Sequence, residues 1–171
     1  VNGGGDLTLN LEKSDFLPVQ RRVTPDWRDY SWLDEDIVMV GLDNQVAEVA
    51  LNDSTSESQT ARASVVSDSS GERQATLIFQ PGTEATAVMP DGAEVPLPTA
   101  SVRATEYTVG PNGPAAMPGE LPPASAYTYA VAFTTDEAIG MGAEHVRFSK
   151  PVINYVDNFL EGYHLPHVHP G

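Results

Sequence analysis

The stretch that decides the fold is residues 101–133, which read SVRATEYTVGPNGPAAMPGELPPASAYTYAVAF. Residues 101–109 alternate polar and apolar side chains, and residues 126–133 form a second β-like run. Residues 110–123 contain too much proline and glycine for a helix, so we expect them to run partly as polyproline II over the surface. A long surface crossing between two strands indicates a β-rich domain.

The runs on either side of the crossing also have short β-like patterns. In 101–109 the packing candidates are Val102, Ala104, Tyr107 and Val109, and in 126–133 they are Tyr127 and Tyr129. Thr135 can cap a short helix over 136–141 that ends near Gly142, with acidic residues in its first turn. Further strands are predicted at 7–11, 16–23, 37–42, 45–51, 62–67, 74–79, 85–89, 94–97, 145–148 and 152–156.

These patterns predict an all-β fold: an antiparallel β-sandwich, or more than one, with one short helix and a long Pro/Gly-rich crossover. Pro18 places the run 16–23 at a sheet edge or in a bulge. The run 37–42 is continuously apolar, which predicts a buried strand. Asp91 and Gly92, between two β-like runs, indicate a hairpin.

Composition restricts the functions that are open to the chain. The net charge is −15 with a pI of about 4.3, so nucleic acid and anionic membrane surfaces are poor partners, whereas cations such as Ca²⁺ are attracted. The chain has no cysteine, which excludes disulfides, thiolate zinc sites and cysteine nucleophiles. There is no run of 18 apolar residues, so membrane insertion is not expected.

Several blocks together resemble bacterial RHS/YD-repeat proteins, in the region just upstream of the repeats. These blocks are RATEYTVGPNGPAAMPGELPP, YTYAV, DEAIGMGA and HVRFSKPVINYVDNF. The FLPVQRRV hairpin is similar to the closing hairpin of a carboxypeptidase-regulatory-like domain, and the chain from Gln74 onward resembles a ZU5-type β-sandwich. The implied division is a hairpin and linker over 1–36, a ZU5-like sandwich over 37–160, and a His-rich tail over 161–171.

The resemblance implies a non-enzymatic structural β module of a large bacterial protein that is secreted or displayed on the cell surface. Its partners would be the neighbouring β modules, and exposed strand edges would also permit self-association. The family assigns no catalytic residue to this segment. The abrupt start at Val1 and the departure from the family pattern after Leu160 lead us to expect a fragment of a larger protein.

Two residue clusters suggest ligand binding. Trp27, Tyr30 and Trp32 are either a carbohydrate-stacking platform or a plug between two β modules. The adjacent acids 34–36 suggest Ca²⁺, but they lack the alternating spacing of a calcium loop, so a solvated turn is the competing interpretation.

The tail gives an alternative function. His164, His167 and His169 form a candidate zinc or copper site, with Asp157 or Glu161 as a base or as the group that orients a histidine. Such a site, or an acidic Ca²⁺ site, would make the chain a small metal-dependent hydrolase of esters or lactones. A loosely binding His-rich end is the competing interpretation, and a structural role is expected for His145.

Glu106 is the remaining candidate, because it lies within a predicted strand beside the crossing. If it is buried, it needs a partner, and the sequence suggests Arg103, which we expect on the same face. The alternatives are a structural ion pair and a carboxylate with a functionally shifted pKa.

Overall fold

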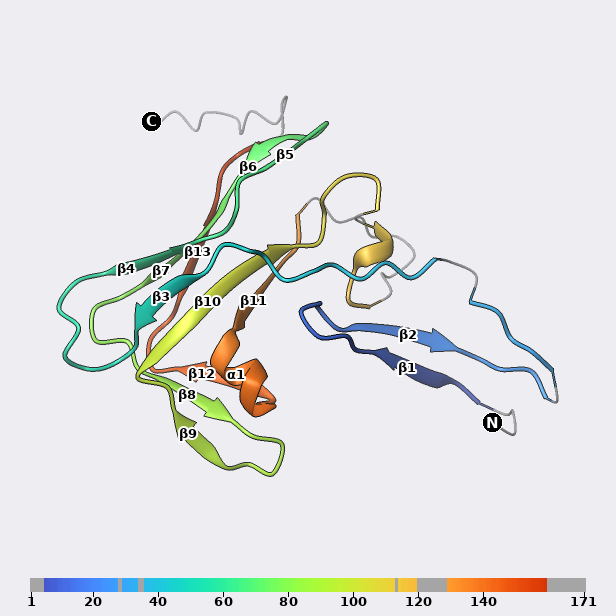
Figure 1. The fold of residues 1–171 in the computed structure, drawn as a ribbon, viewed down its shortest axis with the longest axis horizontal. Coiled ribbons are helices and arrows are strands. Elements are labelled where there is room, and N and C mark those ends of the chain that lie inside the picture. Colours follow the sequence, from blue (N-terminus) through green and yellow to red (C-terminus); the bar gives the residue numbers. More distant parts are fainter. Residues whose placement is uncertain (1–4, 28, 34–35, 113, 120–128, 160–171) are drawn as a thin grey trace, which may run out of the picture.

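The computed structural model describes residues 5–27, 29–33, 36–112, 114–119 and 129–159. The described residues are mostly strand, in several antiparallel sheets, with one short α-helix, which confirms the predicted all-β, sandwich-like fold (Figure 1). No helix in these ranges is long and apolar enough to cross a bilayer.

Two three-stranded sheets form the layers of the sandwich. The first has the order β11-β10-β3 and the second the order β13-β7-β4. Their bounds are Ala47–Ala50 for β3, Gln59–Arg62 for β4, Ala75–Phe79 for β7, Thr99–Glu106 for β10, Val131–Thr135 for β11 and Ile153–Val156 for β13. All the pairs are antiparallel.

Smaller sheets extend this framework. The order β12-β8-β9 forms a third sheet, and β5 pairs with β6 in a hairpin. The hairpin β1–β2 forms a two-stranded sheet that stands to one side of the sandwich (Figure 1). The bounds are Leu7–Leu11 for β1, Val19–Val23 for β2, Val66–Asp68 for β5, Gly71–Arg73 for β6, Ala85–Val88 for β8, Glu94–Pro96 for β9 and His145–Phe148 for β12.

The main core lies between the sheets, because alternate residues of each strand point inward. β7 alternates buried and half-buried residues along its length, and Phe79 is almost fully buried. The core members are Val49, Leu51, Ala61, Leu77, Phe79, Ala85, Ala87, Leu97, Ala100 and Val102.

Local sequence signals placed two elements correctly. Helix α1 (Asp136–Met141) begins at Thr135, whose hydroxyl accepts from the Ala138 N–H, and ends at Gly142 with a left-handed φ of 69°. The β8–β9 hairpin turns at Asp91 and Gly92, where Gly92 has a φ of 83°. Both turns need a backbone conformation that glycine adopts without strain.

Four predictions about strands were wrong. The predicted strand 62–67 is divided between the end of β4 and the start of β5, and residues 63–65 form no strand. Residues 37–42 form no strand: Gly41 makes a single bridge to Phe16, while Val40 and Leu42 pack against a small cluster of Leu17, Tyr107 and Met117. The first strand of the crossing ends at Glu106, which leaves Val109 exposed. The second strand starts at Val131 rather than at residue 126, and residues 126–128 lie outside the described part.

Candidate functional site

A buried arginine, Arg73, is the centre of the most highly bonded polar cluster. Its side chain is 2% exposed. Nη1 and Nη2 donate to the two Asp68 oxygens at 2.9 and 3.0 Å, and Nε and Nη2 donate to Glu106 Oε1 at 2.8 and 2.6 Å. The Phe159 ring covers the guanidinium with its centroid 4.6 Å from Cζ. This arrangement places Glu106 in an ion pair, as one of the two interpretations of the sequence predicted.

The predicted partner of Glu106 was wrong, because Arg103 pairs elsewhere. Arg103 Nε and Nη2 donate to the two Asp136 oxygens at 2.7 Å, and Nη1 donates to the Asp43 carbonyl at 2.6 Å. Side chains alternate along a strand, so residues 103 and 106 of β10 point to opposite faces. Glu106 therefore faces Arg73 of β6, across the sheets.

The bonding pattern of Arg73 identifies a structural clamp. The backbone oxygens of Gly71 and Thr108 accept further bonds from Nη1 and Nη2, so all three nitrogens of the guanidinium are directed at protein oxygens. Hydrogen bonding from Arg73 lowers the pKa of Asp68, and the bond with Asp68 raises the pKa of Arg73. The clamp fixes the β5–β6 hairpin to the end of β10.

Tyr129 lies beside this clamp. Its ring packs against Phe159 with centroids 6.1 Å apart, and burial, followed by the charge of Glu106, raises the pKa of its hydroxyl to about 12. Neither Arg73 nor Tyr129 was among the predicted site residues. The sequence signals for the clamp are Glu106, which was expected to need a partner, and the spacing of Asp68 and Arg73 across a predicted turn.

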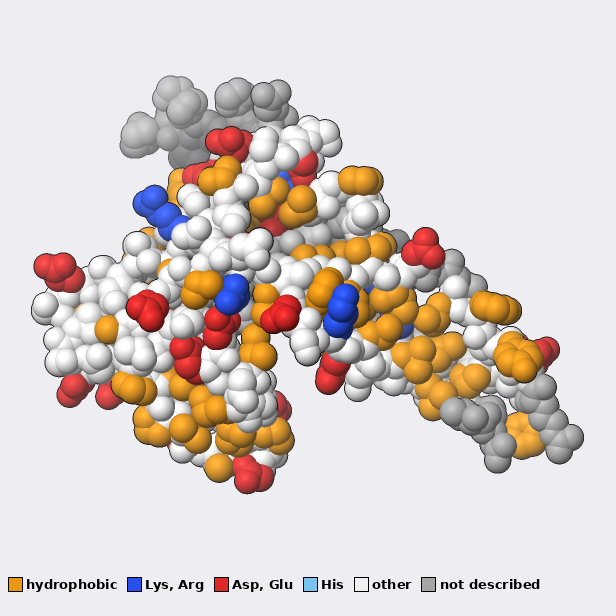
Figure 2. Space-filling model, viewed as in Figure 1, with side chains coloured by type: hydrophobic (Ala, Val, Ile, Leu, Met, Phe, Trp, Pro, Cys, Tyr) orange, Lys and Arg blue, Asp and Glu red, His pale blue; other side chains and the backbone are white. Residues whose placement is uncertain are grey.

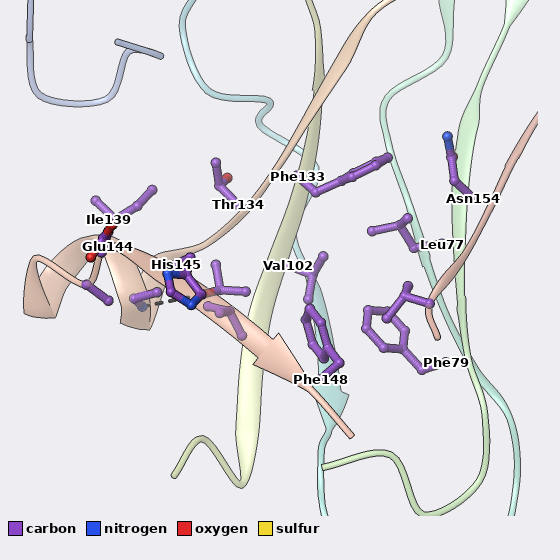
Figure 3. A pocket seen from close by; sticks show the side chains of 15 residues that line it. Leu77, Phe79, Val102, Phe133, Thr134, Ile139, Glu144, His145, Phe148 and Asn154 are labelled. Atoms are coloured by element: carbon purple, nitrogen blue, oxygen red, sulfur yellow. Dashed lines mark hydrogen bonds between the residues drawn. The ribbon is translucent and has the colours of Figure 1, made fainter. Parts of the chain in front are cut away.

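A pocket of about 470 Å³ lies between the two main sheets (Figure 3). Its floor is apolar and includes Leu77, Phe79, Val102 and Phe148. Helix α1 contributes Ala138 and Ile139, and the remaining lining residues are Phe133, Thr134, Thr135, Ala143, Glu144, His145, Val146, Val152 and Asn154. This volume and lining are in the range of small-ligand and side-chain binding sites. The sequence did not predict the pocket, although it singled out His145.

The three aromatic residues of the candidate platform are strongly exposed. Trp27 is 65%, Tyr30 88% and Trp32 86% exposed, so they are not buried among the described residues, and the plug between two β modules stays a prediction. Figure 2 shows further hydrophobic side chains along the neighbouring β1–β2 hairpin, where Leu9 is also exposed. Carbohydrate stacking on these residues stays a prediction.

The candidate metal site falls almost entirely on the C-terminal tail. His164, His167, His169 and Glu161 lie outside the described residues, whereas Asp157 is exposed just after β13. Within the ranges that the structure describes, no three metal-ligating side chains come together. Asp157 and Glu106 lie in different settings, the first at the surface and the second in the Arg73 clamp.

Comparisons of the chain with protein-family models, with curated proteins and with solved structures gave no match.

Proposed function

We propose that the chain is a non-enzymatic structural β module that connects neighbouring β modules of a large bacterial protein of the RHS/YD-repeat kind. In this proposal the parent protein is secreted or displayed on the cell surface. The observation that carries the proposal is the β1–β2 hairpin, a two-stranded sheet docked beside a well-packed sandwich.

The hairpin is attached at one end. Leu17 and Val19 are almost fully buried, and Gln20 N–H donates to the Pro118 carbonyl at 2.8 Å. Arg21 Nη1 and Nη2 donate to the carbonyls of Met117 and Ala115 at 3.0 and 2.7 Å. These contacts fix the hairpin to the Pro/Gly-rich crossing, so the crossing connects the β1–β2 hairpin to the sandwich.

The outer part of the hairpin is less well packed than its attached end. Leu9 is exposed, and β1 has buried no residue fully. A two-stranded sheet is marginally stable alone and usually needs a third strand or a packed face. The hairpin therefore has the properties of one edge of a larger sheet, to which a neighbouring module would contribute the other strands.

Hydrogen exchange measured by mass spectrometry tests this proposal. In the isolated chain, amides of β7 and β10 should exchange slowly, and those at the outer end of β1 and β2 should exchange at least about tenfold faster because they open locally. Adding a neighbouring β module of the proposed parent protein should slow exchange in the hairpin. Equal protection of hairpin and sandwich in the isolated chain would contradict the proposal.

A second experiment addresses catalysis directly. The purified chain is incubated with Zn²⁺ or Ca²⁺ and a panel of esters and lactones. Suppose that the chain shows metal-dependent turnover and that a single substitution among His164, His167 and His169 abolishes it. This result would contradict the structural proposal and support a metal-dependent hydrolase. Protease accessibility of the parent protein on intact cells tests the proposed location.

A further inference from the structure

The two sides of the sandwich are closed to different extents. On one side, the edge strands β3 and β4 are joined by the Gln59 carboxamide, which accepts from Ala50 N–H at 2.9 Å and donates to the Ala50 carbonyl at 2.6 Å. Beyond the other end of these strands, Asp43 accepts from the backbone N–H of Ser64 at 2.7 Å. A side-chain amide thus replaces a backbone pair between the two sheets and seals this side.

The opposite side, between the edge strands β11 and β13, is sealed only at one end of the described strands. There, Val131 and Val156 pack against Ala75 and Ala104. Farther along, Phe133 and Asn154 occupy the inward-facing edge positions, because they pair with the buried Ala104 and Leu77. The pocket opens between them, and Phe133 is 45% exposed.

The free edge of β11 borders this pocket. Tyr107 N–H donates to the Ala130 carbonyl at 2.9 Å, which makes Tyr107 and Ala130 a hydrogen-bonded pair. Hydrogen-bonded and non-hydrogen-bonded pairs alternate, so the peptide groups of Val131, Phe133 and Thr135 point away from β10. β11 is the outer strand of its sheet, so within the described residues no strand pairs with the outward peptide groups of Val131 and Phe133, whereas Thr135 is already engaged as the N-cap of α1.

The bonds of β10 with β3 support this alternation independently. Leu51 N–H donates to the Pro98 carbonyl at 2.8 Å, so residues 98, 100 and 102 of the β10 run face β3. Residues 103, 105 and 107 must then face β11. An edge with unpaired N–H and C=O groups beside an apolar pocket is the arrangement by which proteins bind extended peptides: the edge supplies main-chain bonds and the pocket selects a side chain.

Charge narrows the class of peptide. Among the described residues, Glu144 lines the pocket and no lysine or arginine does, and the chain carries a net charge of −15. An acidic segment would be repelled, whereas a segment with basic or neutral flanks would not.

We propose that the free edge of β11 and the adjoining pocket bind an extended strand of a neighbouring β module, which inserts an apolar side chain over Phe79 and Phe148 and has basic rather than acidic flanking residues. This deepens the connector function proposed above and rests on it. The incoming strand becomes the fourth strand of the sheet β11-β10-β3 and closes the open side of the sandwich.

The test uses a phage library of random octapeptides, selected on the whole chain. Peptides with apolar residues at alternate positions and basic flanks should be enriched. Two variants separate main-chain from side-chain binding: Phe133→Ala keeps the N–H on the free edge, whereas Phe133→Pro removes it without touching a bond to β10. An enriched peptide should bind Phe133→Pro roughly fivefold or more weakly than Phe133→Ala.

A control on the peptide covers the case in which the proline variant does not fold. N-methylation of the alternate amides that face β11 should weaken binding to the unaltered chain to a similar extent. Ala143→Leu, which adds an apolar side chain to the pocket lining, should weaken binding of peptides with a large central residue and spare those with a small one.

Several results would overturn the proposal. These are no enrichment, enriched peptides that bind both Phe133 variants equally, or N-methylated peptides that bind undiminished. A dimer of the chain that Phe133→Pro dissociates would assign the edge to a second copy, and Nile red bound in the pocket but not displaced by the peptide would assign the pocket to a small apolar molecule. None of these results alters hydrogen exchange in the β1–β2 hairpin, so the connector proposal is tested separately.

Discussion

The sealed and the open side of the sandwich each have a carboxamide at an inward-facing edge position. Gln59 of β4 pairs with Phe79, and Asn154 of β13 pairs with Leu77. The Gln59 amide reaches across to the backbone of Ala50, whereas Asn154 is exposed at the mouth of the pocket. The same chemical group therefore closes one side and marks the opening of the other.

The difference shows that the edge residues determine closure here. Both sheets have three strands, so strand number does not distinguish the two sides. On the sealed side the longer side chain satisfies a backbone N–H and C=O between sheets, which would otherwise cost free energy if buried. On the open side β11 is an edge strand, and within the described residues no strand pairs with its outer side. Substitutions on the two sides should therefore have unequal effects.

The largest contrast should come from two phenylalanines that both line the pocket. Phe79 is 1% exposed and lies at its floor, whereas Phe133 is 45% exposed at its mouth. Phe79→Ala should lower the free energy of unfolding by about 3–5 kcal/mol, because it leaves a cavity in the core. Phe133→Ala should cost less than about 1 kcal/mol. Urea unfolding measures both, and equal losses would contradict an open side.

The Arg73 clamp should give the next largest effect. Arg73→Met keeps an apolar contact with Phe159 but leaves the Glu106 carboxylate, which is 6% exposed, without its partner. Breaking a buried pair in this way should cost about 3 kcal/mol. The matched control is Arg147→Met, whose pair with Glu94 is about half exposed on both sides, so its loss should leave the urea midpoint nearly unchanged. Similar losses in urea unfolding would show that the clamp is not structural.

Gln59→Leu tests the seal itself. The substitution removes both bonds to Ala50 and leaves its N–H and C=O without these partners, so we expect a loss of about 1–2 kcal/mol. Exchange of the Ala50 amide should also become faster. Gln45→Leu is the control, because Gln45 is exposed, and it should leave unfolding unchanged. A stable Gln59→Leu variant with a protected Ala50 amide would show that Gln59 does not seal this side of the sandwich.

The pH dependence of the free energy of unfolding tests the contribution of Tyr129, which packs with Val131 and Val156 at the closed end of the open side. The pKa of Tyr129 is raised to about 12 in the folded chain from 10.0, so its contribution is complete below pH 10 and is lost as the pH rises toward 12. Because the ring is only half-buried and solvent screens it, the loss should be about 1 kcal/mol. Tyr129→Phe should lack this part of the alkaline loss, measured by thermal unfolding at pH 9 to 12; identical curves would contradict it.

The elements that were predicted correctly depend on neighbours in sequence. Thr135 and Gly142 bound α1, and Asp91 and Gly92 turn the β8–β9 hairpin, because caps and tight turns are decided within a few residues. The strand predicted at 37–42 was wrong, because the backbone of this run pairs with the hairpin at one bridge only, and composition does not reveal pairing.

The candidate site was harder to predict, since it depends on which distant strands meet. Glu106 was recognised as a residue that needs a partner, but Arg73 lies 33 positions away in sequence and joins it only through the sheet arrangement. The pocket likewise exists because β11 and β13 are both edge strands. No local pattern distinguishes an edge strand from a central one when both alternate in the same way.

The smallest expected effect is also the one of opposite sign. Asn154→Leu places an apolar side chain at the mouth of the pocket beside Leu77 and Phe133, where the polar amide makes no hydrogen bond within the described residues. Filling apolar space without losing a bond should stabilise the fold by about 0.5–1 kcal/mol. Gln59→Leu, the corresponding change on the other side, should destabilise it. If urea unfolding gives both substitutions the same sign, closure does not depend on these two carboxamides.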